Sequence, residues 1–147
     1  MGYNPGVKRI FSLEKEKEGK NQKELRYIVP KILRMLALNR IDLEKDGHWF
    51  FDKIMINTMI DVTRERAERL YWDYQSYNGY IFGLEQGYLP ALDRETGARV
   101  IRYRNDIAAK YNAYNTAYIG LSRIKIEKNM VAVAALANAL RVHSKYF

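Results

Sequence analysis

The sequence predicts an all-α protein: a four-helix-type bundle with an extended or helical arm at its N-terminus. Two observations predict this class. Apolar residues recur at the 3.6-residue period of an amphipathic helix over most of the chain. In addition, 48% of the 147 residues are hydrophobic, which is enough to build one sizeable core. We expect residues 1–40 to form the arm and residues 41–147 to form the bundle.

Residues 49–82 are the stretch around which the bundle is predicted to form. At 100° per residue, its apolar and small residues fall on one side and its charged residues on the other. This pattern indicates a helix of roughly 33 residues, about 50 Å long. Gly79 and Gly83 offer places for it to end. The side predicted to face the core carries Trp49, Ile56, Ile60, Thr63, Ala67, Leu70, Tyr74, Tyr77 and Ile81.

The first forty residues are predicted to carry the basic contacts. Lys8 and Arg9 lie in a Gly- and Pro-containing start, and residues 21–40 form an amphipathic helix with Pro30 in its middle, where we expect a kink or a break. A bent helix that is apolar inside and basic outside suits wrapping around a charged rod. An ordinary surface helix fits the same pattern. The basic residues of this helix are Lys23, Arg26, Lys31 and Arg34.

After the long helix, residues 83–98 are rich in turn-forming residues. Residues 88–92 and 99–102 can pair as a small hairpin, or the segment can be a plain loop. Residues 99–127 form the next predicted helix, with a band of Tyr103, Ile107, Tyr111, Tyr114 and Tyr118. Such a band is typical of a packing seam, although tyrosines beside basic residues can also stack on nucleic acid. Arg99, Arg102, Arg104 and Lys110 are therefore a second choice of nucleic-acid contacts.

Residues 128–147 close the bundle as an alanine-rich helix. Apolar residues lie on nearly every side of residues 130–140, which predicts broad burial.

The composition also predicts which kinds of site are missing. Without cysteine there is no disulfide and no thiolate metal site, and two histidines are too few for a histidine-built one. No Walker loop, GxGxxG, HExxH or nucleophile elbow occurs. We therefore expect no catalytic residue, no metal, no cofactor and no small-molecule substrate, so the protein is not predicted to be an enzyme. No apolar run is long enough to cross a membrane.

The charge of the chain favours a polyanionic partner. Its net charge is +8 at pH 7 and its pI is about 9.6, values typical of proteins that bind nucleic acid or an anionic membrane surface.

In layout, the chain resembles the major coat proteins of filamentous archaeal viruses with linear double-stranded DNA, the lipothrixvirus, tristromavirus and rudivirus group. The shared features are a short basic arm, a Pro-interrupted basic helix, and a tyrosine-rich helical bundle that ends in an alanine-rich helix. The resemblance implies an arm that wraps A-form DNA and a bundle that forms the wall of the virion. It also implies self-association, with or without a paralogous coat protein as the partner in a heterodimer.

These features together predict a structural protein that coats double-stranded DNA regardless of sequence and assembles into a helical virion in the host cytoplasm. The expected phosphate contacts are Lys8, Arg9, Lys23, Arg26, Lys31 and Arg34. Two alternatives stay open. One is a small cytoplasmic helical subunit of an RNA-binding complex, similar to the filament subunits of CRISPR effectors. The other is an adaptor that binds another protein through its tyrosine-rich surface. The sequence alone does not distinguish DNA from RNA.

Overall fold

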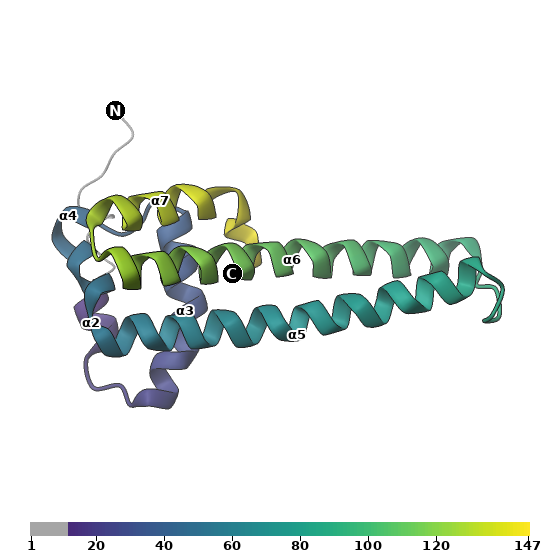
Figure 1. Ribbon diagram of the computed structural model, residues 1–147, viewed down its shortest axis with the longest axis horizontal. Helices are drawn as coiled ribbons and strands as arrows, with labels where there is room; N and C mark the ends of the chain where they lie inside the picture. Colours follow the sequence, from purple (N-terminus) through teal and green to yellow (C-terminus); the bar gives the residue numbers. More distant parts are fainter. Residues whose placement is uncertain (1–11) are drawn as a thin grey trace.

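The computed structural model describes residues 12–147 and shows an all-α protein built on one long helical hairpin (Figure 1). Helices α5 (Lys53–Glu85) and α6 (Arg94–Glu127) run antiparallel and contact each other along their length. Short elements surround one end of the hairpin and form a head. The other end projects from the head as two helices joined by the turn at residues 86–93.

The head consists of α2 (Leu13–Lys17), α3 (Gln22–Ala37), α4 (Leu43–Asp46), α7 (Met130–Leu140) and the 3-10 turns η1 (Gly47–Phe51) and η2 (Arg141–Tyr146). Helix α3 contacts α5, α7 and η2, and α7 lies against α6 (Figure 1). The described residues contain no strand, so the all-α prediction is confirmed. The finer prediction of a four-helix bundle is not confirmed, because the architecture is a two-helix hairpin with a head at one end.

Side-chain caps explain where the long helices begin. The Asp52 carboxylate accepts from the amides of Ile54 and Met55 at 3.0 and 3.1 Å and caps α5. The ammonium group of Lys17 pairs with the same carboxylate and holds the pKa of Asp52 below its usual range. This pair also ties α2 to the start of α5. Asp93 caps α6 through the amide of Thr96 at 2.7 Å.

The hydrophobic core sits in the head. Trp49 and Phe50 of η1 are buried against residues from α3, the first half of α5, the second half of α6, and α7. Their rings meet edge to face with centroids 5.7 Å apart. The largest side chains with almost no exposure are Trp49, Phe50, Leu13, Ile32, Leu33, Leu36, Met55, Met59, Leu121, Ile124, Leu136 and Leu140.

The prediction that residues 1–40 project as an arm is wrong for the helix that they contain. Helix α3 buries Leu25, Val29, Ile32 and Leu33 in the same core as α5, α6 and α7. The apolar side that was expected to line a wrapping arm instead packs inside the head. The helix is also continuous through Pro30, so no break occurs there. Residues 1–11 lie outside the described part of the chain.

Three further boundaries differ from the sequence-based prediction. The long helix begins at Lys53, because residues 47–51 form a 3-10 turn that brings Trp49 into the core. It runs through Gly79 and Gly83 to Glu85. Helix α6 begins at Arg94 and includes residues 99–102, so no strand hairpin forms there, and the irregular segment predicted at residues 83–98 is a shorter turn at residues 86–93.

Helix α7 is buried on one face only, whereas broad burial was expected. Ala132, Val133, Leu136 and Leu140 face the core, while Val131 is 78% exposed. Gly120 of α6 lets α7 approach closely, because a Cβ at this position would lie 2.5 Å from Leu136 Cδ1. The outer face of α7 is therefore apolar and uncovered, with Val131, Ala134, Ala135 and Ala139 all exposed.

Candidate nucleic-acid interface

A basic groove runs between α3 and α5 on the surface of the head. It encloses about 360 Å³. Helix α3 contributes Lys23, Arg26 and Tyr27 to its walls. Helix α5 contributes Val62, Glu65, Arg66 and Arg69. We refer to this hollow as the basic groove.

The packing of α3 on α5 fixes the shape of the groove. Leu25 and Val29 are buried in the core, so Lys23, Arg26 and Tyr27, which lie on another side of the same helix, remain at the surface. The side chain of Gln22 donates to Thr58 Oγ1 at 3.1 Å and joins the start of α3 to α5. The basic side chains therefore project from two helices that are packed against each other.

The charges in the groove favour an anion. Four of its side chains are cationic and one is anionic. Arg26 pairs with that carboxylate, Glu65. The Arg66 guanidinium carbon lies 5.4 Å from the centroid of the Tyr114 ring, a cation–π distance that orients the arginine. Burial raises the pKa of Tyr114, and the charge of Arg66 partly opposes this shift, so at neutral pH the ring is an uncharged phenol.

The exposed ring of Tyr27 gives the groove an aromatic side chain. Tyr27 is 76% exposed, and it lies one helical turn from Lys23. An aromatic ring beside guanidinium and ammonium groups offers a polyanion a flat surface in addition to charge.

The structure brings together two of the six basic residues that were predicted as phosphate contacts. Lys23 and Arg26 line the groove. Lys31 instead pairs with Glu16 of α2 at 2.6 Å, and Arg34 is exposed near the C-terminal end of α3. Lys8 and Arg9 lie outside the described residues.

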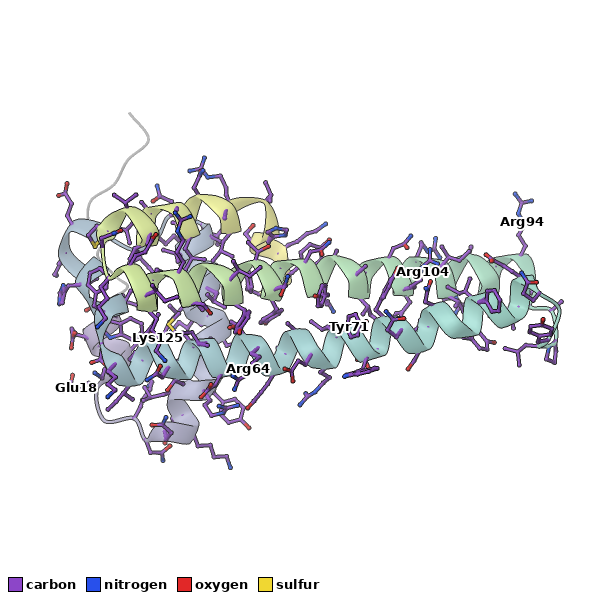
Figure 2. The ribbon with its side chains drawn as sticks, in the orientation of Figure 1. Glu18, Arg64, Tyr71, Arg94, Arg104 and Lys125 are labelled. Carbon is purple, nitrogen blue, oxygen red and sulfur yellow. The ribbon has the colours of Figure 1, made fainter. Side chains whose placement is uncertain are left out.

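The second set of predicted contacts lies on the projecting part of α6, and two of its four members are paired with neighbouring side chains. Arg104 turns toward α5 and donates to Asn78 Oδ1 at 3.3 Å (Figure 2). Lys110 pairs with Asp106 on its own helix at 3.6 Å. Arg99 and Arg102 are exposed.

Arg66 and Arg69 are not among the contacts predicted from the sequence. They lie three positions apart on α5 and therefore on neighbouring turns of one side. That spacing was available in the sequence. The proximity of Arg66 and Arg69 to Lys23 cannot be predicted from the sequence, because it depends on where α3 packs.

A second hollow of about 530 Å³ lies between α5 and α6 where the hairpin leaves the head. Its walls include the rings of Tyr71 and Trp72, which meet at 5.4 Å between centroids, and Tyr111, which lies 6.0 Å from Tyr71. We refer to it as the aromatic hollow. Figure 2 shows Tyr71 and Arg64, another of its lining residues, along α5.

The predicted seam of tyrosines on α6 is partly confirmed. Tyr114 is buried in the core, and Tyr111 packs against it. Tyr103 is mostly exposed, and its ring lies 5.2 Å from that of Tyr77 in the projecting part of the hairpin.

Within residues 12–147, no group of three or more His, Cys, Asp or Glu residues is placed to hold a metal ion. No helix of the described chain is both long enough and apolar enough to cross a membrane. No protein-family profile, curated protein or solved structure matches the chain significantly.

Proposed function

We propose that the protein is a non-enzymatic structural protein that binds double-stranded DNA regardless of sequence and assembles on it into a helical filament, the wall of a virion. The observation that carries the proposal is the basic groove, in which Lys23, Arg26, Arg66 and Arg69 from two helices surround one open hollow. The net charge of +8 adds a general attraction to polyanions.

In this proposal the groove binds the phosphate backbone and reads no bases. Lysine and arginine contacts to phosphates release condensed counterions and carry no sequence information. Arg26 exchanges its Glu65 partner for a phosphate, since an exposed ion pair of this kind is worth only about 1 kcal/mol or less. The exposed apolar face of α7 supports assembly, because a face of this kind is typical of contacts between proteins.

The proposal differs from the sequence-based expectation in where the DNA is held. The expected wrapping helix is part of the head, so the contacts of Lys23 and Arg26 are made by a rigid surface. The DNA therefore lies against the head, across the crossing of α3 and α5.

Fluorescence anisotropy with two labelled DNA duplexes of equal length and unrelated sequence tests the binding proposal. We expect equal affinities, and a slope of log K against log salt of about −3.6 if the four groove cations each contact one phosphate. An affinity that does not change with salt, or a strong preference for one sequence, contradicts the proposal. A duplex RNA bound at least tenfold more tightly than DNA favours the RNA-complex subunit instead.

A further inference from the structure

The projecting half of the hairpin carries a stripe of uncharged residues on each of its two helices. On α6, an uncharged stripe with spacings of four and three residues consists of Ile101, Asn105, Ala108, Asn112, Asn115 and Ile119. On α5, a stripe with the same spacing consists of Tyr71, Gln75, Asn78 and Phe82. These spacings place each set along one side of its helix. In a chain with 29% charged residues, two such stripes are unusual.

Contacts between the helices place the two stripes on the same face of the hairpin. Tyr71 and Asn115, one from each stripe, both line the aromatic hollow. Further out, Asn78 accepts a hydrogen bond from Arg104, which neighbours Asn105 on α6. At 100° per residue, Arg99, Arg102, Asp106 and Lys110 lie on the opposite side of α6, whereas Arg94 falls within the stripe and Arg104 at its edge. We refer to the side that carries both uncharged stripes as the neutral face; Arg64 and Glu68 line the hollow on this side.

The neutral face carries both a protrusion and a hollow. Phe82 is 55% exposed, and Ile101, near the same end of the hairpin, is also exposed. The aromatic hollow lies eleven positions earlier on α5, around Tyr71. This distance corresponds to about 16 Å along the helix. A face with an apolar protrusion at one end and an aromatic hollow at the other is complementary to a copy of itself turned end to end.

From this arrangement we infer that two copies of the chain pair through their neutral faces, with the hairpins antiparallel, and form a four-helix bundle. Phe82 of each copy enters the aromatic hollow of the other. The two-fold axis then passes near Gln75 of α5 and Ala108 of α6, halfway between protrusion and hollow. This inference specifies how two copies associate within the assembly of the proposed function. It rests on that function only because it requires two copies of the chain to come into contact.

The area of the face is sufficient for a stable dimer. With the axis at Ala108, α6 overlaps its mate from residue 94 to residue 122, a length of about 43 Å at ~1.5 Å per residue. Two helices packed about 9 Å apart present a face about 18 Å wide. The pair therefore buries roughly 1,500 Å² in total, within the range of specific protein interfaces.

The test uses the full chain without nucleic acid, so that its failure is separate from failure of the DNA-binding proposal. Analytical ultracentrifugation between about 1 and 100 μM should show a species of twice the 17.3 kDa chain mass. Phe82→Ala should raise the dissociation constant of the dimer at least tenfold, because buried aromatic side chains dominate interface energies. Tyr80→Ala is the matched control, since Tyr80 is also exposed but lies about 200° away around α5.

Single cysteines test the orientation, because the natural chain contains none. Position 108 lies near the predicted two-fold axis, so Ala108→Cys should form an intermolecular disulfide on mild oxidation. Position 106 lies on the charged side of α6, so Asp106→Cys should not form one. A monomer at 100 μM overturns the inference. So does a dimer unaffected by Phe82→Ala, or a disulfide at position 106 but not at 108. A monomer that loses DNA affinity on Phe82→Ala overturns it as well and assigns the neutral face to nucleic acid.

Discussion

Replacing the four groove cations together, as Lys23→Gln, Arg26→Gln, Arg66→Gln and Arg69→Gln, should weaken DNA binding about a thousandfold at low salt. Each lost cation–phosphate contact costs roughly 1 kcal/mol, so four cost about 4 kcal/mol, and 1.4 kcal/mol is a factor of ten. The salt slope should become shallower by about 3.6. Affinity should fall equally for unrelated sequences, since phosphates carry no sequence information.

The matched control removes the same number of positive charges from the projecting hairpin, at Arg99, Arg102, Arg104 and Lys110. If general charge alone attracted DNA, both variants would lose affinity alike. We expect the control to retain most of its affinity and its salt slope. Both variants should melt close to the wild type, because exposed charges contribute little to stability and glutamine keeps helix propensity. A greater loss of DNA affinity in the control than in the groove variant would show that the DNA interface lies on the projecting hairpin.

Leu33→Ala should lower the free energy of unfolding by roughly 3–4 kcal/mol, the usual cost of removing a fully buried leucine side chain. Leu33 is 0% exposed and lies in the core that α3 shares with α5, α6 and α7. Urea denaturation followed by circular dichroism measures the change.

Tyr27→Ala is the control on the same helix. Its side chain is mostly exposed, so the substitution should change stability by no more than about 0.5 kcal/mol. A chain in which α3 projects from the bundle would tolerate both substitutions equally well. Equal and small effects would therefore show that α3 does not belong to the core.

The fold class and most helices could be predicted because they follow from local periodicity. The position of α3 could not. An apolar side opposite a basic one fits a helix that packs in the head as well as one that wraps a partner, and only the non-local contacts of Leu25 and Val29 decide between them. The same contacts bring Lys23 next to Arg66.

Two residues beside the turn between α5 and α6 have a different role in the structure from the predicted one. Asp93 is a favoured N-cap residue, and its carboxylate accepts from the backbone amide of Thr96 where α6 begins, so residues 99–102 lie within this helix. The sequence predicts a helix end at Gly83. In the structure it lies inside α5 and makes room for the chain that returns from the turn, because a Cβ there would be 2.9 Å from Leu89 Cδ1.

Negative-stain electron microscopy of the full chain with and without duplex DNA tests the central claim most directly. We predict uniform filaments whose length follows the length of the duplex, and no such filaments in the protein alone. The groove variant should form none under the same conditions. Absence of filaments at saturating DNA, identical filaments without DNA, or filaments formed only with RNA would each contradict the claim that this protein coats double-stranded DNA.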